Sequence, residues 1–205
     1  MPRKALFTKE EIVAKALDLV RKKGQSALTA RELGAALGSS SRPIFTIFKN
    51  MDEVNAEVRL AAKKLFSDYV ADVNNYVPAF KEFGMRLFRF AQEENHLFRY
   101  LFFQKDSVTE GLHFVTTELL LDIESGYGLS AEQTATLFRQ MWIFICGIAV
   151  LSITGPNNYT SSQVSEMLAL QFISTIRSIK SGEPIPNIEP RLRNDGETLI
   201  LPLNQ

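Results

Sequence analysis

One stretch constrains this chain more than any other: residues 28–54, L-T-A-R-E-L-G-A-A-L-G-S-S-S-R-P-I-F-T-I-F-K-N-M-D-E-V. Thr29 and Glu32 have the spacing of a capping box, in which each side chain accepts a hydrogen bond from a backbone amide, so a helix is predicted to begin at Ala30. Gly38 adopts a left-handed conformation at little steric cost and is predicted to end that helix. The stretch therefore predicts a short helix followed by a tight turn.

A second helix is predicted directly after that turn. Ser40 is the expected N-cap, which places Pro43 in the first turn, where its missing amide costs no hydrogen bond. Ile44, Ile47 and Phe48 then face inward over about two turns. Two helices joined by a tight turn are typical of a helix-turn-helix, whose second helix enters the DNA major groove, although an ordinary helical hairpin has the same spacing.

Charge is distributed unevenly along the chain, whose formal net charge is zero. Residues 1–65 contain 13 Lys and Arg against 7 Asp and Glu, a net charge of +6, whereas residues 66–205 contain 10 against 16, a net charge of −6. A basic segment around the helix pair is the electrostatic pattern expected of a module that neutralises phosphates. The charge distribution therefore favours DNA binding over the hairpin.

The segment before this pair predicts one more helix. Thr8 and Glu11 form another capping box, and Gly24 is the expected end. The cations at residues 21–23 suit the negative end of a helix macrodipole, and a role in solvation and capping is as consistent with them as a DNA contact. Arg3 and Lys4 precede the helix and are predicted to form an arm that can reach a phosphate or the minor groove.

Three segments of the first 55 residues, T-K-E-E-I-V-A-K-A-L-D-L-V-R-K-K-G, L-T-A-R-E-L-G-A-A-L-G and P-I-F-T-I-F-K-N-M-D-E-V, resemble the TetR family of transcriptional regulators. The resemblance implies a three-helix DNA-binding head and a helical body that dimerises and binds a small molecule. The chain departs from the family at Phe45, Ile47 and Met51, where Tyr, His and Lys are usual. Because that Tyr and that Lys commonly touch phosphate in the family, Lys49 is expected to replace them.

The predicted DNA-binding residues are Thr29, Ser40, Ser41, Arg42, Pro43, Phe45, Thr46 and Lys49. Among them, Arg42 is the expected reader of a guanine edge, since Arg bonds both acceptors of guanine in the major groove. Lys49 is expected to contact a phosphate.

A long helix is predicted from Asp52 to about Val73, because this segment lacks Gly and Pro and has apolar residues at helical spacing. The residues that repeat at this spacing are Val54, Val58, Ala61, Leu65 and Tyr69. We expect this helix to be the one element that touches both head and body, and therefore to transmit movement between them.

Five further helices are predicted from caps and apolar periodicity. They begin after Pro78, cover residues 97–103, begin at Asp106 or Ser107 and run through Ile123, begin after Ser130, and cover about 161–180. The tail beyond Gly182 contains four prolines and no helical period, and is expected to be extended or disordered. The predicted fold is all-α with about nine helices, divided into a head (1–51), a body (52–182) and a tail (183–205).

The sequence contains no motif that indicates a catalytic site or a metal site. His96 and His113 do not have ligand spacing to another His, Cys or carboxylate, and no phosphate loop, dinucleotide fingerprint or G-x-S-x-G is present. We therefore predict that the protein is not an enzyme and has no metal or other cofactor. Cys146, the single cysteine, lies in an apolar run and is expected to be buried and inert.

The location of the protein is predicted from its apolar segments. Its N-terminus lacks the apolar core of a signal peptide. The apolar run Met141–Ile153 is shorter than the ~20 residues needed to span a bilayer. A cytoplasmic protein with no membrane partner is the expectation.

The leading functional hypothesis is a homodimeric repressor that leaves a palindromic operator when an apolar small molecule binds its body; the ligand follows from the family resemblance. The predicted ligand-binding residues are Phe88, Phe102, Phe103, His113, Phe114 and Trp142, although the same aromatic residues would also suit a plain core. The alternative is a DNA-bound structural or adaptor protein whose body binds a protein partner and no ligand. An accessible cavity in the body would distinguish the two.

A homodimer is predicted because the helix after Ser130 is apolar on all sides and needs a second cover. Pairing it and the following helix with the same helices of a second copy gives a four-helix interface. The predicted interface residues are Met141, Phe144, Ile148, Leu151, Leu168 and Phe172.

Overall fold

The computed structural model describes residues 6–103, 117–155 and 159–182. The α-helices in these ranges are α1 (Lys9–Lys23), α2 (Ala30–Ala36), α3 (Met51–Val70), α4 (Ala79–Glu93), α5 (Asn95–Phe102), α7 (Thr117–Tyr127), α8 (Ala131–Thr154) and α9 (Ser161–Ser181). Three short 3-10 helices, η1 (Gln25–Ala27), η2 (Ile44–Thr46) and η3 (Val73–Asn75), lie between them. The described residues contain no strand, so the predicted all-α class is confirmed.

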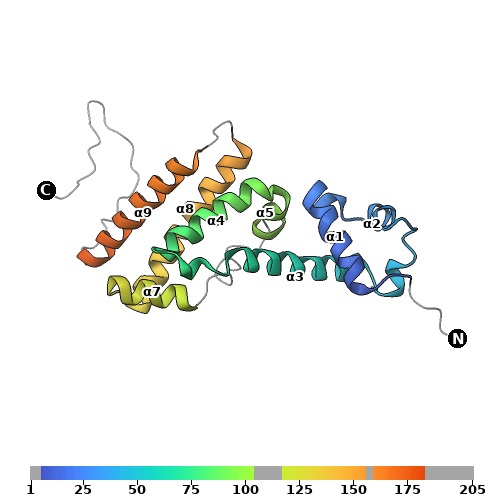
Figure 1. Cartoon of the computed structure of the whole chain (residues 1–205), viewed down its shortest axis with the longest axis horizontal. Helices are drawn as coiled ribbons and strands as arrows, with labels where there is room; N and C mark the ends of the chain where they lie inside the picture. Colours follow the sequence, from blue (N-terminus) through green and yellow to red (C-terminus); the bar gives the residue numbers. More distant parts are fainter. Residues whose placement is uncertain (1–5, 104–116, 156–158, 183–205) are drawn as a thin grey trace, which may run out of the picture.

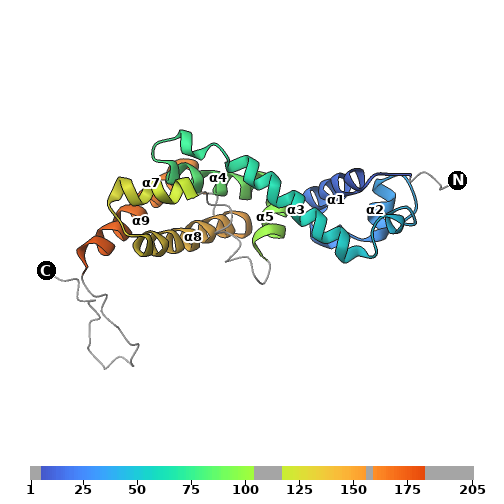
Figure 2. The same cartoon turned by 90° about the horizontal axis from the view of Figure 1, so that it is seen from below.

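The molecule is elongated, with α1 and α2 at one end and α7, α8 and α9 at the other (Figure 1). Helix α3 runs from the first group to the second, and α5 lies near the place where the two groups meet (Figure 2). In the body, α4 packs against α8 and α9, and α7 packs against α8. We call the segment from α1 to the start of α3 the head and the remainder the body.

Helices α1 and α2 begin at the predicted residues. Thr8 and Glu11 form the complete capping box of α1. At α2, Thr29 Oγ1 accepts a hydrogen bond from the Glu32 amide at 3.2 Å, but the return bond is absent because the Thr29 amide already donates to the Ala27 carbonyl at 2.8 Å. The Glu32 carboxylate pairs with Lys23 instead. The start of α2 was therefore predicted correctly, although its capping box is only half formed.

The two-turn helix predicted after Ser40 was wrong. The Thr46 and Ile47 amides bond the carbonyls of Pro43 and Ile44, which is 3-10 spacing, and the α-helical spacing of the Phe48 amide to Ile44 (2.9 Å) is not continued. The physical reason is the next helix: Asn50 has extended backbone, with φ −158°, and its side chain caps α3 by accepting from the Glu53 amide. The extended Asn50 ends the helical path.

The predicted facing of this segment is confirmed despite its shorter helix. Ile44 and Phe48 are buried and Ile47 is half-buried, whereas Arg42 and Thr46 are exposed. The segment reaches this position by close backbone contact with α2. A Cβ added at Gly34 would lie 2.9 Å from the Ser40 carbonyl carbon and from the Ser41 amide nitrogen. Gly34 therefore permits the tight turn.

The apolar spacing identified in α3 is only partly that of its buried stripe: Val54 and Val58 are buried, whereas Ala61, Leu65 and Tyr69 are half-buried beside it. The buried residues continue at intervals of four, through Ala62, Phe66 and Val70, instead of Ala61, Leu65 and Tyr69. Packing in the body causes the difference, because the Phe66 ring lies edge-on to Phe90 at 4.8 Å and to Phe102 at 5.2 Å between centroids. These rings place one stripe of α3 against α4 and α5.

Helix α8 is longer than the apolar run identified in the sequence, with 24 residues that begin after a complete Ser130–Gln133 capping box. By length and composition alone it is able to cross a membrane, and 44% of its most apolar stretch is buried inside the fold. In the body its buried side packs against α4 and α9.

Candidate functional site

The exposed surface of the head around η2 carries most of the predicted DNA-binding residues. Arg42, Thr46 and Lys49 are exposed, and Phe45 is 45% exposed despite its aromatic ring. The Thr46 hydroxyl donates to the Pro43 carbonyl at 2.6 Å, which fixes its rotamer at the end of η2. We call the exposed residues of 40–49 the head rim.

Other residues predicted to bind DNA have local structural roles. The Thr29 side chain caps α2, so its hydroxyl oxygen is already an acceptor. Pro43 precedes η2 as its N-cap, and Ser40 and Ser41 form the turn that passes Gly34. Ser40 is exposed, whereas Ser41 and Pro43 are half-buried.

The cations of the head fall into two groups. Within the described part of the chain, Arg31, Arg42 and Lys49 take part in no ion pair. The run at the end of α1 is different: Lys22 pairs with Asp18 at 2.9 Å and Lys23 pairs with Glu32 at 3.2 Å. Unpaired cations attract phosphate more strongly than paired ones, so Arg31, Arg42 and Lys49 are the better phosphate contacts.

Arg21 joins the head to the body instead of facing outward. Its guanidinium forms a two-bonded ion pair with the Glu94 carboxylate, with Nε to Oε2 at 3.0 Å. The hydrogen bond to Glu94 raises the pKa of Arg21 above its usual value. All three cations of residues 21–23 therefore form ion pairs within the chain, and their contact with DNA stays a prediction.

Helix α5 is a second link between head and body. It packs against α1 and α3, and the Arg59 guanidinium of α3 donates to the Tyr100 carbonyl at 3.1 Å near the end of α5. The Tyr100 hydroxyl lies 2.9 Å from the Asn55 carbonyl and 2.8 Å from its side-chain oxygen, and burial raises the pKa of Tyr100 to about 12. The expectation that α3 alone touches both parts was therefore wrong, because residues far along the chain return to the head.

Four of the predicted ligand-binding aromatic residues lie in the described part of the body. Phe88 is completely buried, and Phe102 and Trp142 are buried edge-on to each other at 5.7 Å. Phe103 is 45% exposed and lies under the Arg99 guanidinium. Phe88, Phe102 and Trp142 are therefore core residues of this chain and Phe103 lies at its surface, while contact of these four residues with a ligand stays a prediction. His113 and Phe114 lie outside the described residues.

A cleft in the body lies elsewhere, where α4, α7, α8 and α9 meet. Its volume is about 210 Å³, and a neighbouring hollow of about 390 Å³ shares part of its wall. The residues that line the cleft are Pro78, Phe80, Lys81, Tyr127, Met141, Leu168, Ala169, Phe172 and Ile173. This site was not predicted from the sequence, because its wall comes from four separate helices. Only the Pro78 helix start and the Gly128 loop after Tyr127 mark its edges in the sequence.

The predicted dimer-interface residues divide into three groups. Met141, Ile148 and Leu168 are buried within one chain, so their assignment to the interface was wrong: α4 and the pairing of α8 with α9 already cover them. Phe144 and Phe172 are half-buried, and Leu151 is 52% exposed. The exposed large apolar residues of α8 and α9 are Ile143, Leu151, Leu170 and Ile173.

Comparison with known proteins assigns no family to this arrangement. No family model matches the chain, and no curated protein matches its sequence. In the described ranges, no group of three or more His, Cys, Asp or Glu side chains is placed to hold a metal ion. The candidate sites are therefore the head rim and the body cleft.

Proposed function

We propose that this protein is a DNA-binding transcriptional regulator of the TetR type, a homodimer that leaves its operator when a small molecule binds the body. The observation that carries the proposal is the head rim, where Arg42 and Lys49 are exposed and take part in no ion pair among the described residues. Lys22 and Lys23 of the head pair with carboxylates, whereas, within the described ranges, the two cations of the rim do not.

The chemistry of the rim suits a DNA groove. An Arg side chain binds the two acceptors of a guanine edge, and a Lys side chain neutralises a phosphate. The exposed Phe45 ring and the Thr46 methyl group offer apolar contacts to the methyl group of thymine. Because η2 is shorter than an α-helix of two turns, the head rim is proposed to enter the DNA groove only shallowly. Its contacts with DNA would then come from the ends of the rim side chains.

A second copy of the chain supplies the symmetry that a palindrome needs. Ile143, Leu151, Leu170 and Ile173 are exposed on two neighbouring helices of the body, an apolar face that pairing of two copies would cover. Two-fold pairing would place two rims on half-sites about 34 to 36 Å apart. Sedimentation equilibrium is expected to give twice the 23.1 kDa chain mass, and a single-chain mass at micromolar concentration would contradict the dimer.

The alternative is a DNA-bound adaptor whose body binds a protein and no ligand. The apolar cleft favours the ligand-responsive regulator, because a concave apolar site with a few polar groups is typical of small-molecule binding.

Selection from a random duplex library tests the proposed function. The full chain is expected to enrich a palindromic sequence whose affinity falls steeply with salt. The double variant Arg42→Ala with Lys49→Ala should enrich nothing, whereas Lys22→Ala with Lys64→Ala, which removes two ion-paired cations, should enrich the same palindrome as the parent protein. Failure of the parent protein to enrich any sequence would reject the proposed function.

A further inference from the structure

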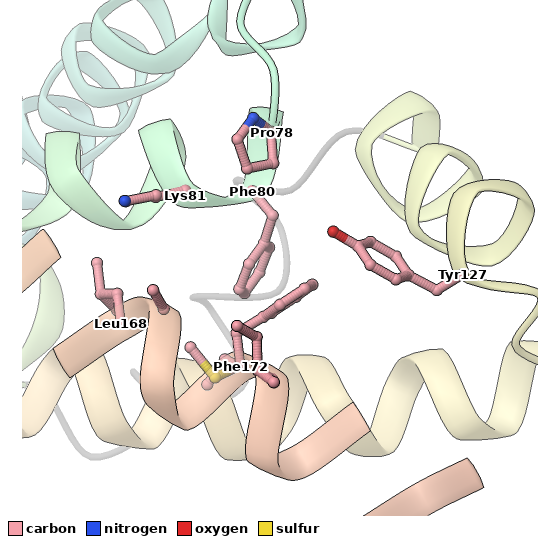
Figure 3. A pocket seen from close by; sticks show the side chains of 9 residues that line it. Pro78, Phe80, Lys81, Tyr127, Leu168 and Phe172 are labelled. Atoms are coloured by element: carbon pink, nitrogen blue, oxygen red, sulfur yellow. The ribbon is translucent and has the colours of Figure 1, made fainter. Parts of the chain in front are cut away.

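The body cleft has an apolar interior built from aromatic rings. Phe80 and Phe172 are stacked with centroids 5.3 Å apart, and Tyr127 meets Phe172 edge-on at 5.2 Å. Figure 3 shows these rings at the centre of the cleft, with Leu168 and Lys81 on the side opposite Tyr127. Flat apolar groups pack well against such walls, since aromatic pairs prefer stacked and edge-on arrangements.

The charge in the cleft has one sign. Lys81 is the single charged residue among the nine that line it, and no described residue forms an ion pair with its ammonium group. Its neighbour Glu82 is occupied, because that carboxylate accepts from Arg86 at 3.0 Å and from Arg89 at 2.7 Å. Lys81 is therefore a half-buried cation that is free to receive an anionic group.

The neighbouring hollow and the cleft carry charges of opposite sign, which would orient a charged ligand. It shares Phe80, Tyr127 and Phe172 with the cleft, but its wall contains Asp122. A carboxylate on that side repels an anion, whereas Lys81 attracts one on the other side. A ligand with one anionic end is thereby oriented, with its charge at Lys81 and its apolar part against the aromatic wall of the cleft.

We propose that the body cleft binds an amphipathic organic anion, an aromatic or aliphatic body that carries one carboxylate or sulfonate. The anionic group pairs with Lys81, and the apolar body packs against the exposed edges of the Phe80 and Phe172 rings that line the cleft. This inference names the effector class of the proposed regulator and so rests on that function. It places the effector away from the buried aromatic cluster around Phe102 and Trp142.

Two fluorescent probes test the charge preference. Anilinonaphthalene sulfonate carries the anion, and N-phenylnaphthylamine has the same rings without it. Lys81→Met is expected to weaken binding of the sulfonate about tenfold, the loss typical of one hydrogen bond to a charged group, and to leave the neutral probe unchanged. Lys81→Arg should keep the sulfonate affinity near that of the parent protein, and Lys64→Met, which removes an exposed cation of α3, should leave both affinities unchanged.

A variant that fills the cleft tests the location. Ala169 lines the cleft, so Ala169→Phe is expected to abolish binding of both probes, whereas Ala135→Phe on the exposed side of α8 should not. Equal sulfonate affinity in the parent protein and Lys81→Met, loss of both probes in Lys81→Met, or retained binding in Ala169→Phe would each overturn the proposal. The titrations contain no DNA, so their failure is distinct from failure of the operator selection.

Discussion

The head and the body bury their cores with different side chains. Aliphatic residues such as Ile12, Leu33 and Ile44 fill the head, and side-chain caps begin each of its α-helices. The body is filled by aromatic rings, and Phe66 and Phe102 belong to a continuous set of edge-on contacts there. Local hydrogen bonds therefore largely position the helices of the head, whereas contacts between residues far apart in the chain position the helices of the body.

The largest expected effect comes from opening the aromatic core. Phe66 is completely buried and touches both Phe90 and Phe102, so Phe66→Ala is expected to lower the free energy of unfolding by about 3 to 5 kcal/mol. Chemical denaturation monitored by circular dichroism measures the change. Phe103→Ala is the matched control, because that ring is 45% exposed and its loss should cost far less. Similar losses in the two variants would contradict the aromatic account of the body.

Adding one methyl group is expected to destabilise the protein at Gly34 of the head and not at Gly126 of the body. Gly34→Ala places a Cβ 2.9 Å from backbone atoms of the η2 turn, which cannot move aside as a side chain would, so a loss of about 1 to 3 kcal/mol is expected. Gly126→Ala in α7 meets nothing within 4 Å and is expected to stabilise by up to about 1 kcal/mol through helix propensity. Thermal melting of both variants provides the measurement, and an undamaged Gly34→Ala protein would disprove the tight turn.

On selected DNA, Arg42→Ala is expected to relax base preference at one position by about 1 to 3 kcal/mol, because a bidentate Arg contact to guanine is lost. Competition binding with single-base variants of the selected site measures this discrimination. Unchanged discrimination would remove Arg42 from the recognition residues.

Lys49→Ala is expected to weaken binding to all DNA sequences alike. It should also reduce the slope of log affinity against log salt concentration by about 1, the contribution of one phosphate contact. Lys22→Ala serves as the control, since Lys22 already pairs with Asp18 and should change neither quantity. A lost base preference in Lys49→Ala, with the salt slope intact, would reverse the proposed roles.

The smallest effect concerns the single cysteine of the chain. Cys146 is half-buried and not fully buried as the sequence predicted, and this burial raises the pKa of its thiol to about 12, so the folded protein disfavours the thiolate. The corresponding stability is present below the unfolded thiol pKa of about 8.5 and is lost progressively as the pH rises above it. Iodoacetamide at mildly alkaline pH should therefore alkylate the native protein much more slowly than the protein unfolded in urea. Equal rates would show that α8 exposes this residue.

Several features of both the head and the body followed from the sequence alone. Thr8, Thr29 and Ser130 cap helices at the predicted residues, because a side chain that bonds an amide three residues away needs no other part of the fold. The all-α class and the exposed rim residues followed in the same way from short-range periodicity. The head rim was therefore predictable as a set of residues, although its helical length was not.

Tertiary structure decided everything that depends on residues far apart in the chain. The pairing of Arg21 with Glu94 joins positions 73 residues apart and turns a candidate DNA contact into a link to the body. The register of α3 beyond Val58 depends on rings of α4 and α5, and the cleft needs walls from four helices. The sequence by itself determined where helices begin and which side chains are apolar; only packing determined which apolar faces meet, because that choice is made by shape and volume over long separations.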